Sequence, residues 1–241
     1  MAGNLAMETP LLRLRDGDNV PMLAFGTGTA WFKEPEDHDK FDKDLVQMAK
    51  DALEAGFRHL DCAEMYDNEA EVGKAIKESG VPRQELFVTT KNLHTPEDYQ
   101  NVWRGMEEVK ASGKAKSIGV SYFRENDGVP YIPWMQEQGI QVEAFKVLTP
   151  LARCPEGPLV GPLERMAKAH NVSDSAVMLR WFLQQNIVGI TTTRKQQRLQ
   201  EYAEALTFEL TKDEMDEIFT EGKKLFKRFY FPERYDPDDR S

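Results

Sequence analysis

Short apolar segments alternate with amphipathic segments along almost the whole chain, and this alternation restricts the possible folds more than any other feature of the sequence. Strands separated by helices pair in parallel, and the strands of such sheets are buried on both faces. The sequence therefore predicts an α/β fold of the barrel type. The six candidate strands are MLAFGT (22–27), FRHLD (57–61), LFVTTK (86–91), AKSIGVS (115–121), IQVEAF (140–145) and IVGITT (187–192).

The segments between these strands have helical periodicity. Residues 41–56 place apolar side chains at helical spacing and end at a glycine, and residues 68–80 end in the same way. Thr211, followed three residues later by Glu214, predicts the capped start of a last helix. A chain of 241 residues without a linker fits one domain spanning residues 1–241. Its irregular tail, about 226–241, forms either a surface strap or part of a pocket wall.

Charge and cysteine content restrict the partners. The formal net charge is −10, and an acidic surface repels nucleic acids and anionic lipids. The chain contains two cysteines and begins without a long apolar run. We therefore expect a cytoplasmic protein, monomeric, that acts on a small molecule rather than on nucleic acid or a membrane.

Polar side chains stand where two consecutive strands end. Asp61 ends FRHLD, Tyr66 follows in the next loop, and Lys91 ends LFVTTK. Active sites of parallel α/β barrels lie at the C-terminal ends of the strands, so the three side chains can converge there. A phenol is a weak acid at neutral pH; a neighbouring ammonium lowers its pKa, and a carboxylate keeps that ammonium charged. Such a trio can protonate the oxygen that becomes negative when hydride reduces a carbonyl.

Longer stretches resemble one family. GFRHLDCAEMYDNEAEVGKAI (56–76) followed by LFVTTK resembles the aldo-keto reductases, which are (β/α)8 barrels that reduce aldehydes and ketones with NADPH. The resemblance extends to SGKAKSIGVSYF, IQVEAF, GITTTRKQQRLQEY and the tail. The sequence of these stretches is similar to that of fungal members of the family. The resemblance implies that Tyr66 is the proton donor, that Lys91 activates it, and that Asp61 is the partner of Lys91. It also suggests a role in fungal secondary metabolism, such as terpenoid or polyketide tailoring, without a metal.

The resemblance also implies a cofactor site for NADPH. Gly26, Thr27 and Asp61 lie near the nicotinamide, Ser121 matches a serine of the family's SNF motif, and Phe145 replaces a Tyr that stacks on the nicotinamide. Thr193 and Arg198 match positions that hold the adenosine 2′-phosphate, Arg194 and Lys195 add positive charge nearby, and Glu201 matches an acid near the adenine. Trp31 is implied to contact substrate.

Two family segments are absent, which predicts an incomplete TIM-type barrel with about six of eight strands. One segment carries a His that orients the substrate carbonyl; the other carries an Asn-Gln pair whose Gln holds the nicotinamide carboxamide. The second carboxamide ligand, the Asn of SNF, is Tyr122, and Thr192 replaces a Lys near the pyrophosphate. His94 matches either a loop His or the catalytic His.

Two functions follow from these observations. The first is NADPH-dependent reduction of an aldehyde or ketone, supported by Asp61, Tyr66 and Lys91. The alternative is a catalytically impaired barrel remnant that binds nucleotide weakly or binds a protein partner, which the missing strands favour.

Overall fold

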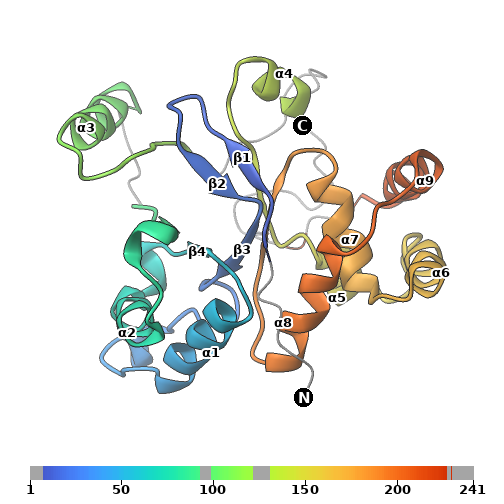
Figure 1. Cartoon of the computed structure of the whole chain (residues 1–241), viewed down its shortest axis with the longest axis horizontal. Coiled ribbons are helices and arrows are strands. Elements are labelled where there is room, and N and C mark those ends of the chain that lie inside the picture. Colours follow the sequence, from blue (N-terminus) through green and yellow to red (C-terminus); the bar gives the residue numbers. More distant parts are fainter. Residues whose placement is uncertain (1–7, 93–98, 122–130, 227–228, 230–241) are drawn as a thin grey trace.

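A five-stranded parallel sheet forms the centre of the computed structural model, which describes residues 8–92, 99–121, 131–226 and 229 (Figure 1). The strand order β5-β4-β3-β7-β6 places the first barrel strand, β3, in the middle. In chain order the strands are β3 (Leu23–Gly26), β4 (His59–Asp61), β5 (Phe87–Thr89), β6 (Glu143–Phe145) and β7 (Val188–Thr191).

The two faces of the sheet bury different sets of side chains. Phe25 and Leu60 are paired across β3 and β4, and both lie in the largest apolar cluster, together with residues of the first helices. On the opposite, interior face, Ala24 and Val188 pack against Val20. Val20 belongs to a hairpin of β1 (Leu11–Arg13) and β2 (Asn19–Pro21), as the turn sequence DGDN predicts. The hairpin therefore fills part of the barrel interior.

The predicted helices are present, with caps that explain their limits. Asp42 accepts hydrogen bonds from the backbone N–H groups of Asp44 and Leu45 at the start of the first helix, and Gly80 ends the second with a φ of 73°. The helices are α1 (Lys43–Glu54), α2 (Glu69–Ser79), α3 (Tyr99–Ala111), α4 (Tyr131–Glu137), α5 (Thr149–Arg153), α6 (Val160–His170), α7 (Asp174–Leu183), α8 (Gln196–Ala203) and α9 (Lys212–Gly222). Helix α5 was not expected from the sequence.

One predicted strand is wrong. Residues 115–121, AKSIGVS, form no strand. In the described chain β5 and β6 are the two edges of the sheet, and the interval between them in the sequence is where the resemblance implies that two family segments are missing. A strand gains its backbone hydrogen bonds only from neighbours, so a segment that has lost the strand on each side has nothing to pair with. Five parallel strands remain instead of six, and Val120 is 66% exposed.

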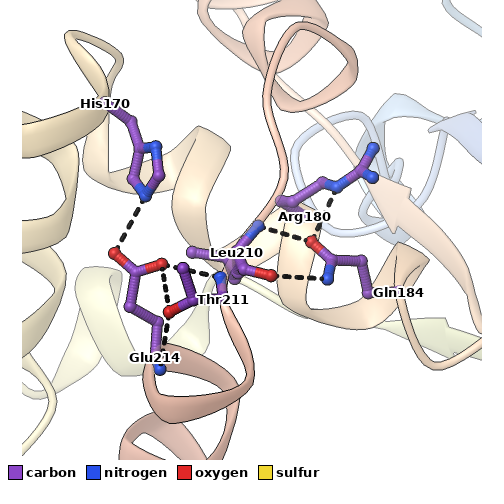
Figure 2. Close-up of polar contacts among 6 residues, drawn as sticks. All are labelled: His170, Arg180, Gln184, Leu210, Thr211 and Glu214. Atoms are coloured by element: carbon purple, nitrogen blue, oxygen red, sulfur yellow. Dashed lines mark hydrogen bonds and ion pairs between the residues drawn. The ribbon is translucent and has the colours of Figure 1, made fainter.

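The C-terminal helices form a second packed unit, fixed by polar contacts between α6, α7 and α9 (Figure 2). Glu214 accepts hydrogen bonds from the N–H and hydroxyl of Thr211 in the predicted capping box, and its other oxygen lies 2.9 Å from His170 Nε2. Gln184 accepts a hydrogen bond from Leu210 N and donates one to Leu210 O. No helix in the described part of the chain is long and apolar enough to cross a membrane.

Replacing Gln184 with Ala is expected to destabilise this unit. The change leaves both backbone groups of the buried Leu210 without their partner, and an unsatisfied buried polar group costs about 1–3 kcal/mol. Urea unfolding should show a decrease of about 2 kcal/mol or more in the free energy of unfolding. Gln200→Ala, at an exposed position of α8, is the matched control. Equal stability of the two variants would contradict the contact seen in Figure 2.

Candidate active site

Asp61 and Lys91 meet because they follow adjacent parallel strands. Beyond the ends of β4 and β5 the pairing continues, since Cys62 N donates to Thr89 O and Glu64 N donates to Lys91 O. Lys91 Nζ lies 2.5 Å from Asp61 Oδ1 and donates a second hydrogen bond, of 2.6 Å, to Cys62 O. The carboxylate is buried and the ammonium is partly exposed. The Asp–Lys pair expected from the sequence is therefore present.

Tyr66 completes the trio from a short 3-10 helix, Glu64–Tyr66, that follows β4. Lys91 Nζ is 5.5 Å from the centroid of the Tyr66 ring. The ring lies directly against Gly28, where an added Cβ would come within 2.8 Å of the ring atom Cζ. A side chain at position 28 would therefore displace the phenol. Among the described residues the Tyr66 hydroxyl has no hydrogen-bond partner, which leaves it available to a ligand.

The charges and burial of Asp61, Lys91 and Tyr66 contradict the expectation that the pKa of Tyr66 is lowered. Burial, and to a smaller extent the charge of Asp61, raise the pKa of Tyr66 from 10 to about 12. The expected lowering by Lys91 is wrong in this arrangement, because burial of the phenol, and after it the negative charge of Asp61, disfavours the phenolate. Tyr66 is therefore protonated throughout the physiological pH range. Burial also raises the pKa of Asp61, and Lys91 offsets part of that effect.

The loop after β3 is fixed beside the trio by hydrogen bonds. Thr27 is buried, and its N–H and hydroxyl both donate to Asp61 O. Asn68 is also buried; its side-chain amide donates to Thr27 O and Trp31 O at 2.8 and 3.0 Å. Gly26, the last residue of β3, pairs directly with Asp61. Gly26 and Thr27 therefore lie beside the trio, and Asn68 is a supporting residue that sequence reasoning missed.

Trp31 is 3% exposed, and a guanidinium covers it. The Arg194 Cζ atom lies 4.3 Å from the centroid of the Trp31 ring, and Arg194 Nε donates a 2.8 Å hydrogen bond to Ala30 O. Arg194 comes from the loop after β7, so this contact joins the loops that follow two neighbouring strands. The resemblance implies that Trp31 contacts substrate and that Arg194 adds positive charge near the 2′-phosphate; their direct contact was not anticipated.

The other candidate residues differ in exposure and in their position relative to the sheet. Phe145 ends β6 with 52% of its surface exposed, and Thr193 is buried just before α8, which carries an exposed Arg198 and a half-buried Glu201. Ser121 is exposed at the end of the unpaired segment, outside the sheet. His94 lies outside the described residues.

Glu143 is a charged residue of the barrel interior that the sequence did not reveal. It pairs with Val188, an interior residue, so its side chain lies on the interior face. The pKa of Glu143 is raised to about 7, chiefly by burial and also by the charge of Asp61, while Lys91 opposes part of the rise. The carboxyl makes no hydrogen bond or ion pair with a described residue. In the sequence, Glu143 is a single acidic residue within a predicted apolar strand. Only the pairing register of β6 with β7 shows which face of the sheet its side chain occupies.

Replacing Glu143 with Gln is expected to change how stability depends on pH. The pKa in the folded chain is about 7, against 4.5 ordinarily, so the folded state holds a proton that the unfolded chain releases between these values. The contribution of the protonated carboxyl is complete below about pH 4.5 and is lost as the pH rises through about 7.

Thermal unfolding across this range tests the effect. Relative to Glu143→Gln, the unmodified chain should lose on the order of 1–3 kcal/mol of stability as the pH rises. Glu137→Gln, at an exposed position, is the control. A difference between Glu143→Gln and the unmodified chain that does not vary with pH would contradict the burial of this carboxyl.

Comparison with known proteins agrees with the fold and with the arrangement of Asp61, Tyr66 and Lys91. The model of the Aldo/keto reductase family matches residues 23–97 and 154–220, leaving unmatched the interval that contains the unpaired segment. An NAD/NADP-dependent indole-3-acetaldehyde reductase of Schizosaccharomyces pombe is 31% identical, over 89% of this chain and 96% of the relative. The chain therefore belongs to the aldo/keto reductase family.

Further comparisons agree. An NADPH-dependent alpha-keto amide reductase of Saccharomyces cerevisiae is 28% identical over 89% of this chain and 91% of the relative. A crystal structure of a Bombyx mori aldo-keto reductase in complex with NADP aligns with a TM-score of 0.76 and 25% identity, over 89% of this chain and 93% of that one. The fold is thus an aldo-keto reductase barrel that is incomplete.

The shortening is visible in the alignments. The alignment with the S. pombe relative runs over 274 residues, more than the 241 of this chain, yet uses only 89% of the chain. The relative therefore has stretches inside the aligned region that this chain lacks. The family model leaves residues 98–153 unmatched, and this interval contains most of the chain between the two sheet edges, β5 and β6.

Proposed function

We propose that this chain reduces an aldehyde or ketone group of a small molecule to an alcohol, with NADPH as the hydride donor. A carbonyl of a fungal secondary metabolite is the substrate class that we favour. The observation that carries the proposal is the arrangement of Asp61, Lys91 and Tyr66 at the ends of neighbouring strands, with the Lys–Asp contact at 2.5 Å. The names of the relatives, which include acetaldehyde and keto amide reductases, support the reaction type.

Residues at the end of β6 and after β7 fit a dinucleotide phosphate. Phe145 offers an exposed aromatic face at a strand end, which suits stacking of a nicotinamide ring. The exposed Arg198 lies in the first turn of α8, where free backbone N–H groups favour an anion. Thr193 Oγ1 accepts a hydrogen bond from Lys195 N, which shapes the loop that precedes this helix.

The contacts support a role for each of the chain's own residues in the proposed reaction. The bound cofactor supplies hydride to the carbonyl carbon. Tyr66, which stays protonated because its pKa is about 12, donates its hydroxyl proton to the carbonyl oxygen as charge develops there. Lys91, held by Asp61 and Cys62 O, places a positive charge beside the ring, 5.5 Å from its centroid. Gly28 lets the ring reach this position.

The proposal is tested by adding NADPH to the protein, following the cofactor's fluorescence, and then adding a reactive aromatic aldehyde. Binding followed by oxidation of the cofactor in proportion to alcohol formed is expected. Binding without oxidation by any of a panel of aldehydes and ketones would support the alternative, a barrel remnant that only binds nucleotide. Absence of both would refute the proposed function.

Cofactor preference gives a separate prediction. If Arg198 contacts the 2′-phosphate, Arg198→Ala should weaken NADPH by about tenfold or more and leave NADH almost unchanged, because a hydrogen bond to a charged group contributes about 1.5–3 kcal/mol. Arg165→Ala, an exposed arginine of α6 paired with Glu217, is the control. Equal weakening of both cofactors would show that Arg198 does not recognise the 2′-phosphate.

A further inference from the structure

Arg194 reaches from the loop after β7 to the turn that follows β3. Its Nε atom donates a 2.8 Å hydrogen bond to Ala30 O, and its Cζ atom lies 4.3 Å from the centroid of the Trp31 ring. The guanidinium is therefore held at two points. Because the side chain is already ordered, little of its conformational freedom remains to be lost when a ligand binds.

The turn that Arg194 contacts also packs on Tyr66. Phe32 N donates to Gly28 O at 3.0 Å within this turn, and Gly28 lies directly against the phenol ring. Phe32 is 39% exposed, and its ring centroid lies 6.3 Å from that of Tyr66. Ala30 stands two residues from both Gly28 and Phe32. Since consecutive Cα atoms are about 3.8 Å apart, the guanidinium lies on the order of 10 Å from the proposed proton donor.

A second cation at the same turn, Lys33, differs from Arg194 in its charge balance. Lys33 Nζ lies 2.8 Å from Oε1 of the buried Glu71, so a carboxylate neutralises this ammonium. Arg194 has no acidic partner among the residues that the structure describes, and its terminal nitrogen atoms, Nη1 and Nη2, bond to none of them. The guanidinium thus presents two free donors, at a fixed position, to a ligand that approaches the turn.

The position of the guanidinium also decides what can contact Trp31. The Trp31 ring is 3% exposed and lies under Arg194. A substrate that reaches this side of the site therefore meets the guanidinium before the indole. The planar, paired donors of arginine fit the two oxygens of a carboxylate, and charge-assisted hydrogen bonds are about twice as strong as neutral ones. An anionic group suits this position better than a neutral one.

We propose that Arg194 binds a carboxylate on the carbonyl substrate, and that the chain therefore prefers aldehydes and ketones that carry such a group. The inference rests on the proposed function and names the substrate class within it. A cofactor phosphate offers the same charge. Arg194, however, is bonded to the turn that packs on Tyr66, whereas the exposed Arg198 lies in the first turn of α8. This difference in position favours the substrate as the partner of Arg194.

The test compares 4-carboxybenzaldehyde with its neutral methyl ester, using NADPH as the cofactor. The measured quantity is the ratio of kcat/KM for the acid to kcat/KM for the ester, because using the same two compounds with each protein cancels their intrinsic reactivity. Arg194→Met keeps a long side chain over Trp31 and removes the charge, so the ratio should fall about tenfold or more. Arg194→Lys keeps the charge without the planar fork and should give an intermediate ratio.

Arg165→Met is the matched control. Arg165 is an exposed arginine of α6 that is paired with Glu217, so its loss changes the net charge by the same amount, and the ratio should stay unchanged. A second measurement does not depend on turnover. The dissociation constants of the acid and the ester, measured with NADP⁺ present so that no hydride is available, should show the same loss of preference in Arg194→Met.

Three results would overturn the inference. The first is an acid-to-ester ratio that Arg194→Met leaves unchanged in both turnover and binding. The second is an equal decrease in Arg194→Met and Arg165→Met, which would show only an effect of net charge. The third is weaker binding of NADPH with NADH spared at an unchanged ratio, which would place Arg194 at the 2′-phosphate. Turnover of neither aldehyde by the unmodified chain would count against the proposed function instead, and binding with NADP⁺ would still decide the role of Arg194.

Discussion

Replacing Tyr66 with Phe is expected to lower carbonyl reduction by about 10²–10⁴-fold, the usual contribution of a positioned general acid, while NADPH affinity stays almost unchanged. The substitution removes one hydroxyl and keeps the ring that packs against Gly28. Since the hydroxyl has no partner among the described residues, its removal should not destabilise the fold. The measurement is kcat with a reactive aldehyde, together with NADPH binding by fluorescence.

Tyr202→Phe is the matched control for this experiment. Tyr202 is buried, and its hydroxyl donates to Thr192 O at 3.3 Å, away from the trio. The control should lose about 1 kcal/mol of stability and little of its activity. A loss of less than tenfold in Tyr66→Phe, or an equal loss in both variants, would rule out Tyr66 as the proton donor.

The second large effect concerns the two missing segments. The resemblance places both carboxamide ligands of the nicotinamide at positions that are changed or lost, the first replaced by Tyr122. A ring that is not held spends less time in the geometry for hydride transfer, and a displacement of about 1 Å can cost about 10²-fold in rate. Restoring both segments from a complete relative should therefore raise kcat by about 10²-fold and tighten NADPH binding much less.

Circular dichroism and unfolding would show whether the restored chain gains order along with activity. Pairing of residues 115–121 with new neighbours should also increase the free energy of unfolding, because β5 and β6 would cease to be edges. An unmodified chain that already equals a complete relative in kcat would contradict the account of the missing ligands and require another means of holding the nicotinamide.

The sequence predicted the parts of the site that depend on local order along the chain. Asp61 and Lys91 each follow an apolar strand, and parallel pairing of consecutive strands brings such residues together, as the 2.5 Å contact confirms. The prediction of a strand at residues 115–121 was wrong because a strand needs more than a local apolar pattern. Its backbone hydrogen bonds would have come from neighbouring segments that, by the resemblance, this chain lacks. The capping box at Thr211 needed only the residues beside it, and it is present.

Other features could not be read from the sequence because they depend on direction and burial. The side chain of Glu143 lies in the barrel interior because of the register in which β6 pairs with β7. Lys146 has a left-handed backbone conformation, which the residue type lysine does not predict. The pKa of Tyr66 is raised rather than lowered as expected, because the phenol is buried and lies near the charge of Asp61. In each case the sequence identified the residue type and the structure determined its surroundings.

The central claim is that hydride passes from NADPH to a carbonyl carbon in the presence of this chain, with the proton supplied by Tyr66. It is tested most directly with NADPH that carries deuterium in place of both hydrogens at C4 of the reduced nicotinamide, an aromatic aldehyde, and mass spectrometry of the product. The account predicts an alcohol with one deuterium on its carbinol carbon, formed by the unmodified chain and lost in Tyr66→Phe. An alcohol without deuterium, or no alcohol from any of a panel of carbonyl compounds despite NADPH binding, would contradict it.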